Sequence, residues 1–346
     1  MIDMIDKKLT IAVVITKHDR ADLFTPETTT RLEALGNVKW NPHDRGLTPD
    51  ETAEFISDAD ICINCWNCVA LDEPVIRHAN NLKLMACIGA SVRMLATDAL
   101  YERGVVVISA NPVYAESVAE GTLGYIIAGL RRIPFYNSAV KDGRWHDRHS
   151  VGSEGLIEKT VGLMGFGAIA QFLTNFLKPF RVKVLAYDPF LSDNSLFDTH
   201  GVSRIDTPEA LFSQSQILSV HLPLTPETIH IIEKNLLRLL PDNALLVNTS
   251  RGSIIDEKAM VNELRSGRIH AVLDVFQHEP LPKENALCKL DNVILMPHMG
   301  GPTNDRLTII GQTLLDDIER FIRNEPLQLI VNRTYAMHMT NDALGH

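Results

Sequence analysis

The sequence predicts an α/β protein made of two doubly wound parallel-sheet domains with a cleft between them. Its 346 residues exceed the roughly 250 to 300 residues at which a single hydrophobic core stops growing. Short apolar runs without polar alternation recur along the chain, as in parallel strands that are covered on both faces. Helix-like segments separate these runs, and this order of strand, helix and strand favours parallel sheets.

The composition limits the classes of partner. Hydrophobic residues make up 45% and charged residues 22% of the chain, which is typical of a globular protein with a large core. The net charge of -10 opposes binding to a nucleic-acid backbone, and no long basic run offsets it. No apolar stretch reaches the roughly 18 residues of a membrane helix, and residues 1–6 carry acids where a secretory signal carries bases. We therefore expect a cytoplasmic protein that binds neither nucleic acid nor membrane.

The first series of strands and helices occupies about the first hundred residues. We expect strands at 9–15, 59–63, 82–88 and 105–108 and helices at 26–35 and 72–79. Ser117 and Glu120 form a capping-box pattern, which predicts the start of a long helix that ends near Arg132. Pro112 disfavours helix just before it, so we place a domain boundary near residue 112.

A second series of strands follows this boundary. We expect its strands at 160–164, 183–187, 217–221, 244–248, 270–273 and 293–296, and six strands complete a Rossmann-like sheet. An apolar stripe from Leu307 to Ile322 then predicts a helix that returns to the first domain. That first domain is therefore discontinuous, 1–112 plus 303–346, and the second is 113–302. The tail beyond about Tyr335 lacks periodicity and is a candidate for disorder.

A glycine fingerprint marks the predicted cofactor site. The strand at 160–164 runs into the pattern Gly-x-Gly-x-x-Ala at 165–170, which opens a helix. Gly165 permits the tight turn, Gly167 lets the backbone approach a pyrophosphate, and Ala170 allows the helix to pack on the strand. The next strand ends at Asp188, where an acid accepts hydrogen bonds from the adenosine ribose and repels the 2'-phosphate of NADP. The pattern therefore predicts NAD as the cofactor.

Three functional side chains follow successive strands of this second series. Arg251 comes after the strand at 244–248, Glu279 after the strand at 270–273, and His298 after the strand at 293–296. Ligands of open α/β sheets bind at the carboxyl ends of the strands. We therefore expect the three side chains to meet on one rim.

With these motifs in order, the chain resembles the D-isomer-specific 2-hydroxyacid dehydrogenase family over nearly its whole length. The resemblance rests on the glycine fingerprint and on the segments 221–228, 248–252, 274–281, 291–293 and 297–301. It implies an oxidoreductase that moves a hydride between NAD(H) and a small D-2-hydroxy acid or 2-keto acid. It also implies a substrate domain in 1–112 plus 303–346, an NAD-binding domain in 113–302, and a homodimer with the Ser117 to Arg132 helix as an interface element.

The resemblance assigns a role to each residue of the site. The arginine matching Arg251 holds the substrate carboxylate and keto oxygen, the histidine matching His298 is the general acid/base, and the glutamate matching Glu279 hydrogen-bonds the imidazole. The residue types suit the chemistry, because reduction of a ketone needs a cation and a proton donor beside the developing alkoxide. Asp274 is expected to bind the nicotinamide carboxamide. Three further residues are expected along the pyrophosphate: Ala168, Ile169 and Thr228.

The substrate loop departs from the family pattern. Where the family has a sequence similar to Gly-Val-Gly-x-Asp-Asn-x-Asp, whose backbone amides hold the carboxylate, residues 89–96 read Gly-Ala-Ser-Val-Arg-Met-Leu-Ala. Ala90 and Ser91 are the expected substrate-binding positions. Arg93 either adds a cation for a diacid or phosphorylated substrate or forms a structural ion pair, and the abundance of arginine on protein surfaces favours the ion pair.

Two other functions are compatible with parts of the same sequence pattern. An NAD-sensing, corepressor-like binding protein without metabolic turnover resembles the same family and keeps its Arg, Glu and His, so turnover of a 2-keto acid decides between them. A hydrolase of the adenosylhomocysteine type needs a larger cap domain than 1–112 provides.

Three cysteines repeat at a spacing of three residues: Cys62, Cys65 and Cys68. The repeat lacks the fourth thiolate of an iron-sulfur ligand run and is typical of reduced, structural cysteines. We therefore expect no metal site.

Overall fold

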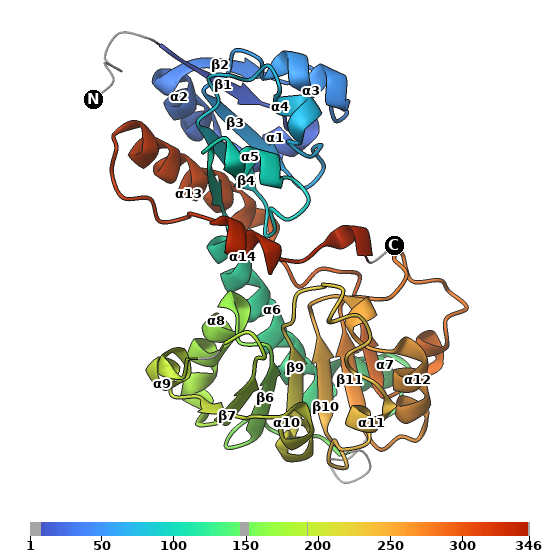
Figure 1. Cartoon of the computed structure of the whole chain (residues 1–346). Helices are drawn as coiled ribbons and strands as arrows, with labels where there is room; N and C mark the ends of the chain where they lie inside the picture. The colour runs from blue at the N-terminus through green and yellow to red at the C-terminus, as the bar shows by residue number, and fades with distance from the viewer. Residues whose placement is uncertain (1–7, 146–151, 192, 345–346) are drawn as a thin grey trace. The chain divides into compact units, whose positions relative to one another are not determined.

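The computed structural model describes residues 8–145, 152–191 and 193–344, so the acidic start at residues 1–6 lies outside the described residues. The contacts of the described chain divide it into two compact units. Unit 1 extends to Tyr114 and includes Pro302–Asn341, and unit 2 is Ala115–Gly301 together with the residues from Asp342 on. The sequence-based division instead keeps residues 303–346 together. Figure 1 shows a sheet with helices in each unit, and the predicted α/β class with two parallel sheets is confirmed.

Unit 1 contains a five-stranded parallel sheet. The strand order is β2-β1-β3-β4-β5, the flavodoxin-like order, which places a switch point between β1 and β3. Every residue of the central strands β3 and β4 is buried, which explains their uninterrupted apolar sequences. The strands are β1 Leu9–Val13, β2 Gly36–Trp40, β3 Ile61–Cys65, β4 Leu84–Ile88 and β5 Val106–Ser109.

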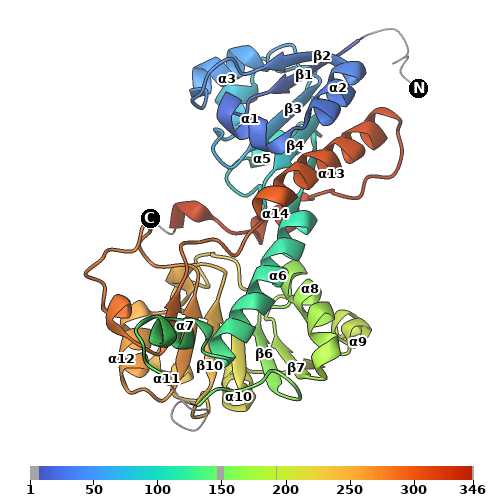
Figure 2. The same ribbon diagram turned by 180° about the vertical axis from the view of Figure 1, so that it is seen from behind.

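Helices cover both faces of the unit 1 sheet. One face packs against α3 Pro49–Phe55, α4 Glu73–Ile76 and α5 Asp98–Glu102. The other face packs against α1 Lys17–Leu23, α2 Pro26–Leu35 and α13 Asn304–Ile322. Figure 2 shows α13 beside β4 and α1. A side chain at Gly311 would lie 2.1 Å from the carbonyl oxygen of Leu23, so glycine lets α13 approach the end of α1.

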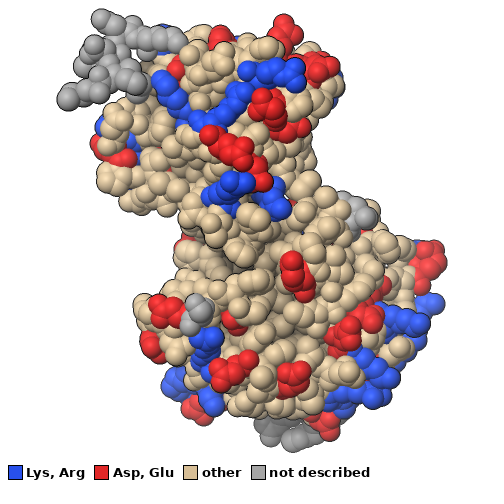
Figure 3. Space-filling view, in the orientation of Figure 1, with Lys and Arg blue, Asp and Glu red and all other residues tan. Residues whose placement is uncertain are grey.

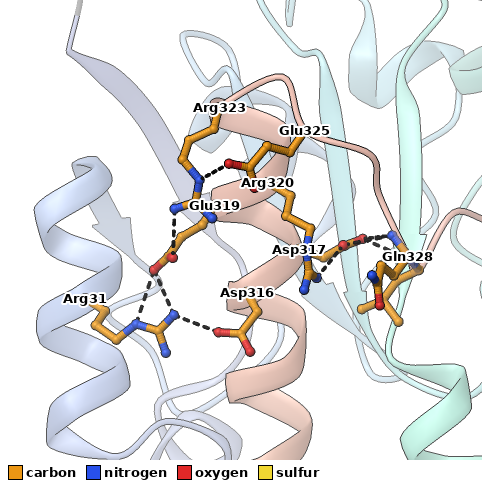
Figure 4. Close-up of polar contacts among 9 residues, drawn as sticks. Arg31, Asp316, Asp317, Glu319, Arg320, Arg323, Glu325 and Gln328 are labelled. Carbon is orange, nitrogen blue, oxygen red and sulfur yellow. Dashed lines mark hydrogen bonds and ion pairs between the residues drawn. The ribbon is translucent and has the colours of Figure 1, made fainter.

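Charged side chains also attach α13 to the beginning of unit 1 (Figure 4). Arg31 of α2 contacts Asp316 at 2.7 Å and Glu319 at 2.8 Å. Asp317 is fully buried and accepts hydrogen bonds from the backbone amides of Gln328 and Leu329. A buried carboxylate needs such partners, so Asp317 fixes the point where the chain turns back after α13.

Unit 2 contains a seven-stranded parallel sheet. Its order, β12-β11-β10-β9-β6-β7-β8, is the Rossmann order extended by one strand, with the switch point between β6 and β9. Six of its strands lie where the sequence predicts them, and the two-residue β8 was not predicted. The strands are β6 Thr160–Met164, β7 Lys183–Tyr187, β8 Ser203–Arg204, β9 Ile217–Val220, β10 Leu245–Asn248, β11 His270–Leu273 and β12 Val293–Leu295.

Two layers of helices enclose the unit 2 sheet. One core joins the sheet to α10 Pro208–Gln214, α11 Lys234–Leu237 and α12 Glu257–Arg265. The core on the other face contains residues of α6 Asn111–Leu130, α8 Ala168–Leu177 and α9 Ser195–His200. Helix α7 Ile133–Lys141 follows α6. Short 3-10 turns complete the unit: η1 Lys178–Phe180, η2 Gly252–Ile254 and η3 Ala286–Lys289.

Three local predictions differ from the structure. The long helix α6 begins at Asn111 rather than at Ser117, which is buried within it, because proline at the second helical position needs no backbone partner for its missing N–H. Strand β2 was missed because its five residues include glycine and lysine at a sheet edge. The tail forms α14 Arg333–Met337 and η4 Asp342–Leu344 rather than an irregular segment.

The cysteine repeat lies on and after β3. Cys62 and Cys65 point to opposite faces of the strand and belong to different cores, as the alternation of side chains along a strand requires. Cys68 folds back so that its sulfur lies 3.9 Å from that of Cys65. All five cysteines are free thiols. Within the described chain, no cluster of three or more His, Cys, Asp or Glu side chains is arranged to hold a metal.

The exterior carries charges of both signs. On the face drawn in Figure 3, Lys and Arg side chains are interspersed with Asp and Glu on each unit. None of the described helices combines the length and the apolar composition needed to cross a membrane.

Candidate active site

The glycine turn joins β6 to α8 at the switch point of the unit 2 sheet. Gly165 has a φ of 97°, which favours glycine, and a Cβ there would come within 2.8 Å of the carbonyl oxygen of His221. Gly167 is exposed, and among described residues no heavy atom outside its own chain neighbours lies within 4 Å of the place of its missing Cβ. No described side chain caps the first turn of α8. Its free amides and the open approach over Gly167 therefore fit a pyrophosphate group.

Asp188 follows β7 and holds the glycine turn in place. Its Oδ2 accepts a hydrogen bond from the amide of Phe166 at 2.8 Å, and its Oδ1 accepts one from the amide of Phe190 at 2.9 Å. A carboxylate offers about four acceptor positions. Both oxygens therefore keep capacity for the hydroxyls of an adenosine ribose.

The residues expected along the pyrophosphate differ in exposure. Ala168 and Ile169 are half-buried in the first turn of α8. Thr228 is buried, and its hydroxyl accepts from the amide of Thr225 at 2.8 Å and donates to the carbonyl of Pro223 at 2.7 Å. In this structure the Thr228 side chain stabilises the loop after β9, and its contact with a cofactor stays a prediction.

His221 directly follows β9, and no role was predicted for its side chain from the sequence. Burial lowers its pKa to about 3, so the ring is neutral at physiological pH. Neither ring nitrogen has a hydrogen-bond partner in the described part of the chain. A neutral imidazole carries one N–H donor, so an unused donor lies at the carboxyl end of β9, next to the glycine turn.

Arg251 follows β10 in a turn that its neighbours fix. Asn248 donates from Nδ2 to the carbonyl of Arg251 at 3.0 Å and accepts from the amide of Ser250 at 3.0 Å. A side chain at Gly252 would lie 1.9 Å from the carbonyl carbon of Phe276. The turn after β10 therefore passes very close to the turn after β11. This close approach explains why glycine follows Arg251 in the sequence.

The guanidinium of Arg251 makes two hydrogen bonds within unit 2. Its Nη1 donates to the carbonyl of Ser250 at 2.7 Å. Its Nε donates to Oδ1 of Asp342 at 2.7 Å, in an ion pair whose side chains are 30% and 52% exposed. Asp342 was not identified from the sequence, because 91 residues separate it from Arg251 and no local pattern links them.

Glu279 and His298 form a direct pair. The Nδ1 atom of His298 lies 2.7 Å from Oε2 of Glu279, and the other carboxylate oxygen accepts from the amide of Phe276 at 2.9 Å. The backbone of His298 has a φ of 56°, a left-handed conformation that costs energy for a residue with a side chain. Because Glu279 engages Nδ1, the Nε2 atom is the one left to exchange a proton with a ligand.

The electrostatics of this pair favour its charged form. The hydrogen bond to Glu279 raises the pKa of His298, against burial and the nearby charge of Arg251, which lower it. Burial by itself raises the pKa of Glu279, but the bonds from His298 and from the Phe276 amide outweigh it, and the net pKa is lowered. Arg251 acts on both partners electrostatically. The structure therefore brings Arg251, Glu279 and His298 into one neighbourhood of unit 2.

Asp274 directly follows β11 and is almost fully buried. Its two oxygens accept from the amides of Met299 and Gly300, each at 2.8 Å, and Oδ1 also accepts from the hydroxyl of Tyr125 at 3.1 Å. These bonds fix the turn that carries His298. A fourth acceptor position remains available for an amide group.

The substrate loop belongs to unit 1. Ala90 is exposed, and its carbonyl accepts from the side chain of Asn111 at 2.6 Å. Ser91 donates its hydroxyl to the carbonyl of Thr340 at 2.8 Å and accepts from the amide of Arg93 at 3.2 Å. In the described chain the guanidinium of Arg93 has no ion-pair partner, so the favoured structural ion pair is not found.

Comparisons with known proteins point to one family. Residues 123–300 match the family model described as D-isomer specific 2-hydroxyacid dehydrogenase, NAD binding domain. A D-3-phosphoglycerate dehydrogenase of Methanocaldococcus jannaschii is 36% identical over 87% of this chain, and a hydroxypyruvate reductase of Thermotoga maritima is 34% identical over 79% of it. The chain covers 56% of the former protein and 88% of the latter. It spans about half the length of the phosphoglycerate dehydrogenases that it matches.

A solved structure supports the same fold. A protein of Pyrococcus horikoshii OT3 superposes with a TM-score of 0.79, covering 95% of this chain and 96% of its own, at 24% sequence identity. The predicted cofactor is confirmed as NAD by the family of the matched domain. On the family model and on relatives covered over most of their length, the chain belongs to the D-isomer specific 2-hydroxyacid dehydrogenase family.

Proposed function

We propose that this protein is an NAD-dependent dehydrogenase that transfers a hydride between NAD(H) and a small D-2-hydroxy acid or 2-keto acid. One observation carries the proposal. The imidazole of His298 is hydrogen-bonded to Glu279 at 2.7 Å, and the charge of Arg251 acts on both. A cation, a proton donor and a carboxylate that supports the donor are the groups required to reduce a ketone that carries a carboxylate.

In this proposal Arg251 binds the substrate carboxylate and keto oxygen through its planar fork of N–H donors. Protonated His298 donates its Nε2 proton to the oxygen of the ketone during reduction, and neutral His298 accepts that proton during oxidation of the alcohol. Glu279 orients the ring and favours the imidazolium. The strained backbone of His298, held by Asp274, fixes the ring before substrate arrives.

The residues of the cofactor crevice fit NAD. Bound NADH supplies the hydride. Gly165 and Gly167, with the first amides of α8 at Ala168 and Ile169, receive the pyrophosphate, and Asp188 accepts from the ribose. Asp274 accepts from the nicotinamide carboxamide, and Thr228 supports the neighbouring loop.

We assign NAD binding to 113–302 and substrate binding to 1–112 plus 303–346. In the substrate domain, we assign the loop amides at Ala90 and Ser91 to the substrate carboxylate. We also propose a cytoplasmic homodimer with the Ser117 to Arg132 helix as an interface element. Helix α7 follows this helix and leaves Ile133 and Val140 about half exposed. Light scattering of the purified chain tests the dimer.

The test of the function is oxidation of NADH with a panel of 2-keto acids. Glyoxylate, hydroxypyruvate, pyruvate, branched 2-keto acids and 3-phosphohydroxypyruvate cover the size and charge range. We expect turnover with at least one, loss of substrate use with retained NADH binding in Arg251→Ala, and reduced kcat in His298→Ala. NADH binding without turnover of any acid would instead support an NAD-sensing, corepressor-like protein. Unchanged kinetics in both variants would refute the assigned roles.

A further inference from the structure

A carboxylate of the chain itself already occupies the arginine that the proposed function assigns to the substrate. Oδ1 of Asp342 accepts a hydrogen bond from Nε of Arg251 at 2.7 Å. Both residues belong to unit 2, so the contact lies within one compact unit. A carboxylate on a guanidinium is the same chemistry that a 2-keto acid would present to Arg251.

The position of Asp342 is supported by the residues around it. Asp342 begins the 3-10 turn η4, and Leu344 at the end of this turn packs against the unit 2 core that contains β9, β10 and β11. The carbonyl of Ser250 holds the other side of the guanidinium at 2.7 Å. Anchored at Leu344, the turn keeps the carboxylate close to Arg251 at a high effective concentration.

The ion pair is nonetheless easy to exchange. Its side chains are 30% and 52% exposed, and ion pairs with this degree of solvent contact contribute little to stability. Arginine has five N–H donors, and the hydrogen bonds to Asp342 and to the carbonyl of Ser250 use only two of them. A substrate carboxylate can therefore approach the same guanidinium, but it must displace Asp342 or share the cation with it.

We propose that Asp342 is a specificity-determining residue, an internal carboxylate that competes with substrate for Arg251. This inference rests on the proposed function. A carboxylate ligand must displace Asp342 from Arg251 or share the cation with it, so the residue weakens the apparent binding of every monocarboxylate by the same factor. Its negative charge also disfavours substrates with a second anionic group, because like charges at close range repel.

The test replaces Asp342 with asparagine, which keeps the size of the side chain and removes its charge. We expect the KM for a monocarboxylate 2-keto acid to fall by about two- to fivefold, the range that an exposed ion pair supports, with kcat unchanged. The dissociation constant of oxamate, a non-reducible analogue, should fall by the same factor in calorimetry with NADH present. The KM for a dicarboxylate 2-keto acid should fall further than that for the monocarboxylate.

Asp242→Asn is the matched control. Asp242 forms an exposed ion pair with Arg268 in the same unit but precedes β10, whereas Arg251 follows it. We expect its KM values to equal those of the wild type.

The outcomes separate the two proposals. If the wild type turns over no 2-keto acid and Arg251→Ala leaves oxamate binding unchanged, the proposed function fails and this inference fails with it. If Arg251→Ala abolishes oxamate binding but Asp342→Asn leaves KM and oxamate affinity unchanged or weakens them, the proposed function stands and Asp342 is not a competitor.

Discussion

Replacing Asp188 with asparagine tests the selection of NAD over NADP. The carboxylate accepts from the amides of Phe166 and Phe190 at 2.8 and 2.9 Å, so a substitution must keep an acceptor for the turn. Phe166 is fully buried, and an unsatisfied buried amide costs roughly 1–3 kcal/mol. Asparagine keeps one side-chain oxygen and removes the charge, whereas alanine removes both acceptors.

The size of the effect follows from two contributions. A hydrogen bond to a charged group is worth about 1.5–3 kcal/mol and a neutral one about 0.5–1.5 kcal/mol, so the ribose of NADH loses about 1 kcal/mol. A carboxylate and a phosphate charge about 5 Å apart repel by roughly 1–3 kcal/mol at the effective dielectric of a half-buried site, and NADPH regains this amount. The ratio of kcat/KM for NADH to that for NADPH should therefore fall by about 2–4 kcal/mol, or about 30- to 800-fold.

The assay measures kcat/KM for both cofactors with one saturating 2-keto acid. Asp193→Asn is the control, since it removes an exposed charge from the same loop and should leave the ratio unchanged. Thermal unfolding of Asp188→Ala should show a loss of stability that Asp188→Asn avoids. A ratio that stays within twofold of the wild type in Asp188→Asn would refute the assignment of this acid to the ribose.

Three further predictions concern the acid/base pair and the packing of α13. In Glu279→Gln, the pH at which kcat/KM for reduction falls should move to lower pH, because reduction needs protonated His298 and Glu279 raises the pKa of that ring; a profile that is unmoved, or moved to higher pH, would contradict the pairing. Gly311→Ala should destabilise the protein by about 1–3 kcal/mol in urea unfolding, because the added carbon would lie 2.1 Å from a backbone oxygen at the end of α1, and wild-type stability would show that α13 can shift freely. Asp317→Asn should lower the free energy of unfolding by about 1–3 kcal/mol, since the fully buried carboxylate accepts from two backbone amides. Asp316→Asn weakens only a partly exposed pair with Arg31 and should lower it by at most about 1 kcal/mol. Equal losses in the two variants would exclude the role of Asp317 in fixing the turn after α13.

Most strands of the two sheets were predictable because they are buried on both faces. A run such as 160–164 needs no knowledge of its neighbours, since continuous apolar sequence bounded by turns already identifies it. The edge strand β2 lacks this signal, because its residues are mostly half-buried and mixed in polarity. The start of α6 was predicted wrongly for a related reason. The pattern at Ser117 is a valid local cap, but the packing of the helix extends it to Asn111.

The sequence indicates which residues belong to the candidate site, but it does not indicate the contacts that these residues make. Arg251, Glu279 and His298 each follow a recognisable strand, and the parallel sheet brings strand ends together whatever the intervening sequence. The backbone conformation of His298 and the bonds of Asp274 to the turn that carries it depend on distances that no spacing encodes. The hydroxyl of Thr228 shows the same limit, because its sequence position fits a ligand contact while its geometry supports a loop.

Asp342 illustrates why the last step from sequence to function needs coordinates. Its segment has no periodicity, and a single turn, η4, places its carboxylate on Arg251. An arginine in a dehydrogenase site must bind a carboxylate strongly enough to orient substrate, yet an unpaired guanidinium would also bind any other anion in the cell. An internal, weakly held carboxylate reduces this conflict, because it lowers the affinity for every anion by the same factor and repels anions that carry a second negative charge. The selection against dianionic substrates then depends on the charge of Asp342, and raising the ionic strength should weaken it.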